Sequence, residues 1–392
     1  MGEDTESSLY NRLGASSSKA GVLKAVGAKT PSHFIEFCDD VCDDPNYQSF
    51  LHADGAGTKS IVAYLAYRET NDPTWFRSLA FDSLVMNLDD VICAGIPETL
   101  ILSNTIGRNK ALIPDEAISA IINGYKDLIS NLKSQGISIS LCGGETADVG
   151  DLVRTCIVDS TLYGRIKKSN IISTDSIKAG DIIIGLSSTG KATYETENNS
   201  SIGSNGLTLA RHALINQKYA QKYPEILDPN IPKESSYCGK YSLLEPIANL
   251  SGISIAKALL SPTRTYAPVI KKILDTESRE LIHGIIHCTG GGQTKALRFG
   301  KNVRYVKNDL FPCPAVFQLI KQSLNVPWKE MYSVFNMGHR MEIYCAESVA
   351  ASIIAISKSF GIEAKKIGYV AASKSSNTLC ISSPESDIEY SN

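Results

Sequence analysis

The chain has 392 residues, with 39 basic and 41 acidic side chains and a formal net charge of −2. This balance gives no electrostatic basis for binding nucleic acid or an anionic membrane surface. One hydrophobic core rarely grows beyond about 250–300 residues, so we expect two domains.

The start of the chain, MGEDTESSLYNR, is polar and acidic, unlike the basic and then apolar start of a signal peptide. No apolar run approaches the roughly 20 residues that a membrane span needs. Ten cysteines are scattered along the chain, none in a CxxC pair, and Cys38 and Cys42 have no partner at zinc spacing. We therefore expect a cytoplasmic protein without a structural zinc site.

In the first half, residues 1–44 are expected to form an arm and residues 45–167 a first domain. A helix is predicted over 77–94, where Ala80, Leu84, Leu88 and Val91 recur at helical spacing. The other elements predicted here are strands at 48–53, 100–105, 138–142 and 160–166 and a helix at 114–134.

The polar segment 167–181 indicates a junction, after which residues 168–392 form a second domain. Residues 191–204 are polar and are predicted to be a long surface loop. Strands are expected at 181–186, 281–288, 339–346 and 365–372, and helices at 205–220, after Pro262 and at 347–360. This alternation of strands and helices is typical of an α/β (α+β) chain.

The first chemical motif is HADGAGTKS, at residues 52–60. Gly55 and Gly57 permit positive φ, Asp54 suits a metal ion, and Thr58 and Lys59 suit phosphate oxygens. A hairpin turn is the alternative, because Asp-Gly is a common hairpin signal.

The predicted helix at 77–94 carries Asp82, Asp89 and Asp90 on or near one side. The alternative is a solvated helix face. However, the helix is otherwise apolar, and neighbouring carboxylates repel each other unless a cation lies among them. The pattern favours metal binding.

A second glycine motif, LCGGETADVG at 141–150, follows a predicted strand. Glu145 is expected in a loop beside Gly143 and Gly144, at a strand end where ligands commonly bind. A plain turn with a surface glutamate is the alternative. Two such loops in one chain suggest ATP chemistry with Mg²⁺.

The second half adds HCTGGGQTK, in which three glycines follow a strand, and SPTRTY, in which Thr263 and Arg264 suit phosphate. His283 and His287 alternate with apolar residues and fit core histidines equally well. The segment GLSSTGKAT at 185–193 is not a Walker A loop, because Ala192 stands where the Mg²⁺-binding hydroxyl belongs.

Taken together, these segments resemble the family of phosphoribosylformylglycinamidine cyclo-ligase, also called aminoimidazole ribonucleotide synthetase. The matching segments occur in the family's order: DGAGTK, AFDSLVMNLDDVICAG, GGETAD, SNGLTLAR, SPTRTY, HCTGGG and EMYSVFNMG. The resemblance implies a two-domain fold of the PurM type, whose N-terminal strands form a barrel in a homodimer with ATP near the interface. It also implies ATP-dependent ring closure of formylglycinamidine ribonucleotide in purine biosynthesis.

The resemblance also assigns site residues by their match to the motifs. Metal ligands are Asp54, Asp82 and Asp90, and catalytic residues are Asp54, Lys59 and His287. The nucleotide is contacted by Gly55, Gly57, Thr58, Lys59, Gly143, Gly144, Glu145 and Thr146. Substrate is contacted by Ser204, Asn205, Gly206, Thr263, Arg264, Gly290, Gly291, Gly292 and Asn336.

The chain departs from the family pattern at several places, including Asp89-Asp90 where Asn-Asp is usual and about a dozen extra residues after Gly190. Gly203 stands where a histidine usually precedes the SNG motif, and Gly338-His339-Arg340 replaces the usual glycine-rich GVG. Our hypothesis is that His339 or Arg340 takes the place of the lost histidine. The arm also diverges, and Lys19 and Lys24 are the candidates for its lysine contacts.

Two rival functions remain open from the sequence. One is another ATP-dependent phosphotransferase of the same superfamily, against which HCTGGG and FNMG argue. The other is a nucleotide-binding protein that has lost catalysis, which the altered SNG segment permits, although the acidic positions are all present.

Overall fold

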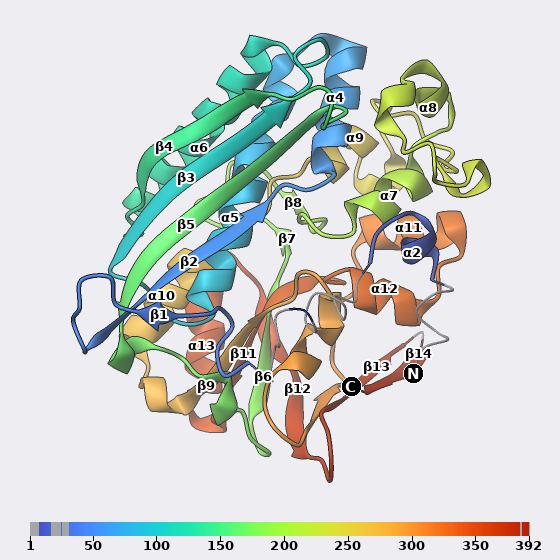
Figure 1. Ribbon diagram of the computed structural model, residues 1–392. Coiled ribbons are helices and arrows are strands. Elements are labelled where there is room, and N and C mark those ends of the chain that lie inside the picture. The colour runs from blue at the N-terminus through green and yellow to red at the C-terminus, as the bar shows by residue number, and fades with distance from the viewer. Residues whose placement is uncertain (1–7, 17–24, 26–30, 385, 392) are drawn as a thin grey trace.

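A computed structural model describes residues 8–16, 25, 31–384 and 386–391 (Figure 1). Two sheets, one from each half of the chain, lie one above the other, with helices packed on and between them. Within the described residues all ten cysteines are free. None of the described helices combines the length and the apolar character needed to cross a membrane.

The first sheet has five strands in the order β1-β2-β5-β3-β4. All neighbours are antiparallel except β3 and β4, which run parallel because helix α6 connects them. The strands are β1 (Cys38–Asp39), β2 (Tyr47–Gly55), β3 (Thr99–Arg108), β4 (Ser140–Asp148) and β5 (Cys156–Lys167). The sheet is open in one chain, so the barrel implied by the resemblance is not closed here.

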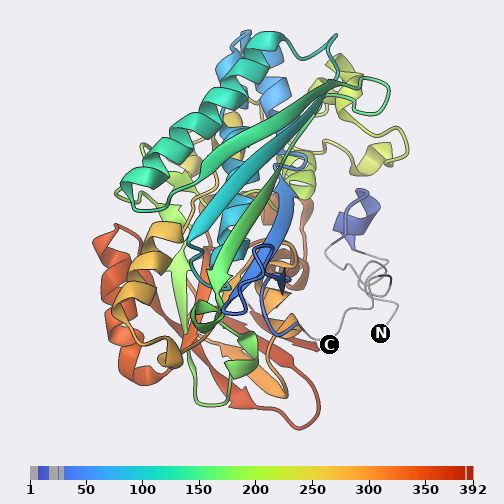
Figure 2. The same ribbon diagram turned by 60° about the vertical axis from the view of Figure 1, so that its left-hand side comes forward.

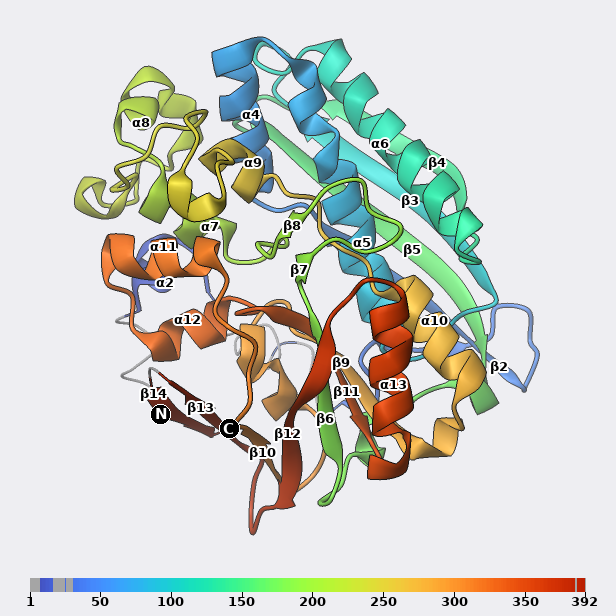
Figure 3. The same cartoon turned by 180° about the vertical axis from the view of Figure 1, so that it is seen from behind.

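Helices α4 (Lys59–Thr70), α5 (Ser78–Ile92) and α6 (Asp115–Ser134) cover one face of this sheet (Figure 3). Almost every residue of α5 is buried, because the helix packs on β2 and β5 on one side and meets the second half of the chain on the other. A buried helix can be apolar all round. Its three aspartates must therefore find partners inside the protein.

The other face of the first sheet carries no helix (Figure 2). Buried and exposed residues alternate along β5, as expected of a strand with one covered face. Leu51 and Ile157 lie on the uncovered face with 71% and 40% of their surface exposed. We call this the open face.

The second sheet has seven strands in the order β14-β13-β10-β12-β6-β11-β9. Its central strands are fully buried, since α10 and α13 cover one side and the first half of the chain lies nearby (Figure 3). The strands are β6 (Ile182–Ser187), β9 (Ile282–His287), β10 (Val303–Lys307), β11 (His339–Cys345), β12 (Ala364–Ala372), β13 (Thr378–Ser383) and β14 (Ser386–Ser391).

The remaining elements connect the strands of the two sheets or pack against them. They are α2 (Leu9–Arg12), the small pair β7 (Thr189–Gly190) and β8 (Asn199–Ser200), α7 (Leu207–Leu214), α8 (Lys218–Lys222), α9 (Ile255–Leu259), α10 (Ala267–Thr276), α11 (Ala315–Leu324), α12 (Trp328–Val334), α13 (Glu347–Ser359) and several 3-10 turns, of which η8 (Gly292–Arg298) matters most below.

Three predictions about elements are wrong. Residues 143–148 are part of strand β4 rather than a loop. The helix expected over 205–220 is two helices, because the chain turns extended at Ile215. The segment 191–204 is not a free surface loop, since Ala192, Ser201 and Ile202 are fully buried.

Candidate functional site

A pocket of about 280 Å³ lies where the two halves meet. Its walls come from β2 and α5 of the first half and from the loops before α7 and after β9 of the second. Six of the residues selected from the sequence line it: Asp54, Asp90, Asn205, Gly206, Gly290 and Gly291. Motifs about 150–200 positions apart are thereby brought to one place.

Asp54 lies at the end of β2, one residue before the strand gives way to the loop that starts α4. Gly55 is still in the strand and has no positive φ, contrary to expectation. A Cβ on Gly55 would meet the Asp159 carboxylate at 1.7 Å, so close approach explains this glycine. Gly57, with φ +56°, is the residue that needs the left-handed region.

Asp90 is held from behind by a fixed histidine. His287 Nδ1 lies 2.7 Å from Asp90 Oδ1, and Arg340 Nε lies 3.2 Å from His287 Nε2. A guanidinium can only donate, so Nε2 accepts and Nδ1 carries the proton that it donates to Asp90. His287 is thus a neutral, fully buried positioning residue that does not line the pocket.

The charge states of this pair follow from its surroundings. Burial lowers the pKa of His287 to about 4; Asp90 opposes this, whereas Arg340 and Lys295 add to it. Burial alone would raise the pKa of Asp90, but the hydrogen bond from His287 and the nearby charges of Lys295 and His52 hold it below its usual value. Asp90 therefore presents an ionised carboxylate to the pocket at neutral pH.

Lys59 and Asp82 do not line the pocket, so their predicted contacts with phosphate and metal stay predictions. Lys59 Nζ lies 2.7 Å from Asp82 Oδ1 and donates to the carbonyls of Gly203 at 3.1 Å and Ser261 at 2.6 Å. Both side chains are fully buried. Burial lowers the pKa of Lys59 and raises that of Asp82, and their close contact opposes both shifts. Three oxygens around one ammonium group favour the charged pair.

Thr263 is also occupied by this pair. Its backbone N–H and its hydroxyl donate to Asp82 Oδ1 at 3.1 and 2.5 Å. About two helical turns further along α5, Asp89 accepts hydrogen bonds from the Thr265 hydroxyl at 2.6 Å and from the Tyr266 N–H. Burial raises the pKa of Asp89 to about 7. Of the three aspartates on α5, only Asp90 lines the pocket.

Arg264 and Asn336, predicted to contact substrate, instead fix the loop that follows β6. Arg264 donates to the Glu195 carboxylate and to the carbonyls of Ser187, Thr189 and Gly190. Asn336 accepts from Ser188 and Ser201 hydroxyls and donates to the Ser201 carbonyl. Both side chains are buried, and neither lines the pocket.

Two further predicted residues join the halves beside the pocket. Ser204 Oγ donates to the Ala56 carbonyl at 3.2 Å, and Thr58 Oγ1 lies 3.1 Å from Thr208 Oγ1. Gly292 is buried at φ +50°, where a Cβ would meet the carbonyl oxygens of Phe335 and Tyr332 at 2.6 Å. These three residues shape the pocket without lining it.

The predicted nucleotide residues Gly143, Gly144, Glu145 and Thr146 do not reach the pocket. They lie on β4, the exposed edge of the first sheet. The register pairs Asp54 with Ser160, Ser160 with Asn104 and Asn104 with Gly144. Three strand spacings separate Asp54 from Gly144 along this row, about 14 Å.

The structure also shows the surroundings of Gly203, His339 and Arg340, where the chain departs from the family pattern. A Cβ on Gly203 would lie 3.1 Å from Arg340 Nη1, so the arginine occupies the space beside this glycine. Arg340 is buried, donates to the Arg264 carbonyl and leaves Nη1 without a partner among the described residues. His339 instead bonds Glu342 at 2.8 Å. The hypothesis of a substitute for the lost histidine therefore narrows to Arg340. Lys19 and Lys24 lie outside the described residues.

The pocket fits a magnesium ion through its oxygen donors. Asp54, Asp90 and the amide of Asn205 line one cavity, and oxygen ligands of this type are those Mg²⁺ prefers. A second group, Cys288, His339 and Glu342, also has metal-ligating atoms close together. There the ammonium of Lys307 already lies 2.5 Å from Glu342 Oε1, so the cation position is filled.

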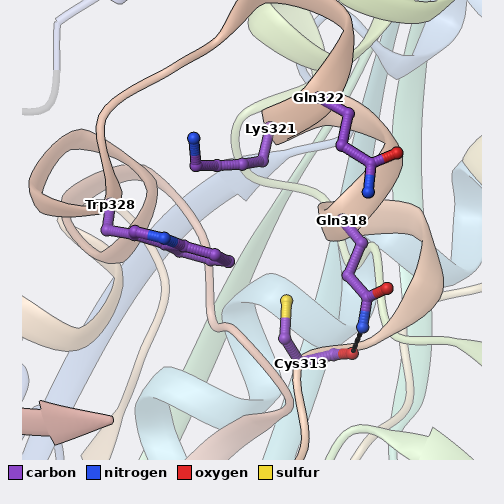
Figure 4. Close-up of a pocket in the computed structure, with 5 residues that line it drawn as sticks. All are labelled: Cys313, Gln318, Lys321, Gln322 and Trp328. Atoms are coloured by element: carbon purple, nitrogen blue, oxygen red, sulfur yellow. Dashed lines mark hydrogen bonds between the residues drawn. The ribbon is translucent and has the colours of Figure 1, made fainter. Parts of the chain in front are cut away.

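A second hollow, of about 380 Å³, lies at α11 and α12, away from these residues (Figure 4). Lys321 lies over the Trp328 ring, 5.5 Å from its centroid, and Gln318 bonds the Cys313 carbonyl at 2.8 Å. Its five lining residues include no carboxylate and no glycine loop. The pocket between the halves is therefore the candidate site.

Nine lining residues of the candidate site were not singled out from the sequence, and four of them have an ionisable side chain: Tyr10, His52, Lys295 and Arg298. His52 Nδ1 bonds Asn87, and its Nε2 lies 3.5 Å from Asp90 Oδ2. For His52, Lys295 and Arg298, the sequence signal that could have identified them was their position next to the glycine motifs. Tyr10 belongs to the arm, and the bond from its N–H to Glu330 at 2.8 Å has no local sequence signal.

Two family models match the chain in succession. Residues 36–166 match the AIR synthase related protein, N-terminal domain, and residues 178–380 match the AIR synthase related protein, C-terminal domain. Together they contain every residue of the candidate site except those of the arm.

Curated relatives agree with these matches. The chain is 31% identical over 339 residues to the phosphoribosylformylglycinamidine cyclo-ligase of Methanococcus vannielii, covering 86% of this chain and 79% of that protein. It is 30% identical over 327 residues to the protein of that name from Methanocaldococcus jannaschii, covering 83% and 79%.

Solved structures show the same fold at lower identity. Thiamine monophosphate kinase from Aquifex aeolicus superposes with a TM-score of 0.51 at 11% identity, covering 91% of this chain and 94% of that one. The enzyme from Stenotrophomonas maltophilia K279a gives 0.50 at 15% identity, covering 88% and 90%. This likeness establishes the fold alone.

Proposed function

Because the chain belongs to the AIR synthase related family, we propose that it is an ATP-dependent cyclo-ligase of purine biosynthesis. Its reaction converts formylglycinamidine ribonucleotide and ATP to 5-aminoimidazole ribonucleotide, ADP and phosphate. Two relatives at 30–31% identity over more than four fifths of the chain carry that name. We propose a cytoplasmic location, which its ten free cysteines support.

The observation that carries the proposal is the composition of the pocket. One wall presents the carboxylates of Asp54 and Asp90, and another presents the backbone of Asn205–Gly206 and Gly290–Gly291. Carboxylates suit the magnesium of a nucleotide, whereas glycine-rich backbone lets a phosphorylated substrate approach closely. The two substrates of the reaction need these two kinds of surface.

The chemistry explains why ATP is needed. An amide oxygen is a poor leaving group, so it first attacks the γ-phosphorus, and the bond from that phosphorus to ADP breaks. A neighbouring nitrogen then attacks the activated carbon, forms the C–N bond of the ring and expels phosphate, and a proton is lost. No protein nucleophile is required. The enzyme contributes alignment, charge stabilisation and exclusion of water.

Within this scheme, Asp54 and Asp90 would hold Mg²⁺, with Asn205 beside them. When bound, the ion neutralises the charge that develops on the transferred phosphoryl group. His287 does not transfer a proton, because both of its ring nitrogens are engaged. It keeps the Asp90 carboxylate oriented and ionised.

We also propose that the chain works as a homodimer through the open face and the β4 edge. Exposed Leu51 and Ile157 and an unpaired edge strand are features that a second copy would cover. Pairing there brings Gly143–Thr146 against the second copy, with ATP near the interface. Replacing Leu51 by Glu should yield monomers by sedimentation, and Leu244→Glu, an exposed leucine of the second half, is the control.

The deciding experiment supplies purified protein with ATP, Mg²⁺ and formylglycinamidine ribonucleotide, and measures ADP and the aminoimidazole together. Substrate-dependent ADP matched one to one by product is the expected result. ADP formed from a different phosphate acceptor would favour the phosphotransferase alternative. Nucleotide binding without either product would favour the non-catalytic alternative.

A further inference from the structure

The pocket has a basic wall, formed by Lys295 and Arg298 of η8. This 3-10 helix begins at Gly292, directly after the glycine loop that follows β9. A 3-10 helix has three residues per turn, so side chains at i and i+3 project on the same side. Lys295 and Arg298 are spaced in this way, and both line the pocket.

Arg298 is half-buried, and no hydrogen bond or ion pair joins it to another residue that the structure describes. Partial withdrawal from water lowers the pKa of its guanidinium. A charge held in this way is costly unless an opposite charge meets it. An anion bound at this wall would therefore offset the cost of holding the Arg298 charge there.

Lys295 strengthens the positive potential at the same place. Its ammonium lies 5.1 Å from the centroid of the Phe34 ring, and its charge helps to keep the pKa of Asp90 low. With Lys295 at one end and Arg298 one turn later, the wall presents two cations to one cavity of about 280 Å³. Paired cations of this kind suit a phosphate group.

We propose that Arg298, assisted by Lys295, binds the 5′-phosphate monoester of the ribonucleotide substrate. This deepens the proposed function and rests on it for the identity of the substrate. The acidic wall repels a phosphate that carries no metal, so the metal-bound triphosphate belongs beside Asp54 and Asp90. The monoester brings no metal with it and belongs on the basic wall.

The test compares Arg298→Gln, Arg298→Lys and Lys295→Gln with the control Arg304→Gln, an exposed arginine of β10 that pairs with Glu389. Loss of a charge-assisted hydrogen bond should raise KM for formylglycinamidine ribonucleotide roughly 10- to 100-fold in Arg298→Gln. KM for ATP should stay unchanged, and Arg298→Lys should recover part of the loss. Thermal unfolding shows whether each variant is folded.

A second readout needs no turnover. Calorimetric titration of the full chain with ribose 5-phosphate, and with ribose as the uncharged comparison, should show binding of the ester alone. Arg298→Gln should weaken that binding at least tenfold, and Arg304→Gln should leave it unchanged.

The outcomes separate this inference from the proposed function. Binding that depends on Arg298 in a protein that makes no aminoimidazole would refute the cyclo-ligase and leave the phosphate site standing. Product formation with unchanged KM and unchanged ester binding in Arg298→Gln would overturn the site and leave the cyclo-ligase standing. A rise in KM for ATP alone would assign the wall to the triphosphate and also overturn the proposal.

Discussion

The covered face and the β4 edge of the first sheet carry similar residues in different surroundings. On the covered face, Asp54 at the end of β2 and Asp90 on α5 meet the second half of the chain around a pocket. At the β4 edge, Gly143, Gly144 and Glu145 are exposed. Both sets are glycine-framed acidic motifs, yet only the first forms a site within one chain.

The difference shows that motif type does not determine position. The register places Asp54 and Gly144 on one row of the sheet, and strand order alone keeps them about 14 Å apart. A motif on a covered face is completed by the rest of its own chain. The motif on the β4 edge lies apart from the pocket, and in the proposed dimer a second copy would complete it.

The largest effect is expected from removing the negative charge of Asp90 on the covered face. Asp90→Asn should lower kcat/KM by roughly 10²–10³-fold, since a group that stabilises transferred charge is lost. The fold should persist, because the asparagine oxygen still accepts from His287. Coupled assay of product measures the loss. The control Asp127→Asn, on the outer side of α6, should be neutral, and near-normal activity in Asp90→Asn would contradict the role of this face.

The next prediction concerns the buried pair within the same motif. Lys59→Met should destabilise the protein by roughly 3–5 kcal/mol, because it leaves the Asp82 charge buried without its partner. Urea unfolding measures this. Lys59→Met/Asp82→Asn should recover part of the stability, whereas exposed Lys110→Met should change it by less than about 0.5 kcal/mol. A mild effect in the single variant would mean that the pair is not charged.

The open face is tested by mixing two inactive variants. If Glu145 acts across a dimer on the site that contains Asp54, then Asp54→Asn and Glu145→Gln each inactivate the protein alone. Random exchange of subunits should restore about a quarter of wild-type activity, since half of the dimers are mixed and each has one intact site. Absence of recovery after proven exchange would place both residues in one chain's site.

The smallest effect is expected at Gly203. Gly203→Ala should cost about 1–2 kcal/mol of unfolding free energy, because φ is +63° and the new Cβ approaches Arg340 Nη1. In an Arg340→Ala background the cost should shrink to the backbone part alone. An equal loss of unfolding free energy in both backgrounds would show that Arg340 does not clash with a side chain at position 203.

Sequence patterns correctly predicted the helices and strands whose apolar residues recur at regular spacing. The helix predicted over 77–94 is α5 at 78–92, and the strands predicted at 281–288 and 339–346 are β9 and β11. Helix α4 was missed because the glycines before it suggested a loop. Strand β4 was misread for the same reason, since an exposed edge has no apolar alternation to reveal it.

Among the site residues, the sequence could not distinguish a side chain that faces the pocket from one that faces inward. Asp82 and Asp90 lie on one helix, but Asp82 meets Lys59, 23 residues earlier, and Asp90 meets His287, 197 residues later. Arg264 satisfies carbonyls more than 70 positions away. Such long-range partners are fixed by tertiary packing, which local spacing does not encode.

The bonds that α5 and the start of α4 make to the second half bear on how this protein can be divided. Lys59, Asp82, Asp89 and Asp90 all take partners beyond residue 200. A gene split at the 167–181 junction would produce two polypeptides that each lose hydrogen-bond partners present in the intact chain, which favours their reassociation. We expect each fragment alone to be degraded in a cell. The two fragments together would form a split reporter whose signal measures their reassembly.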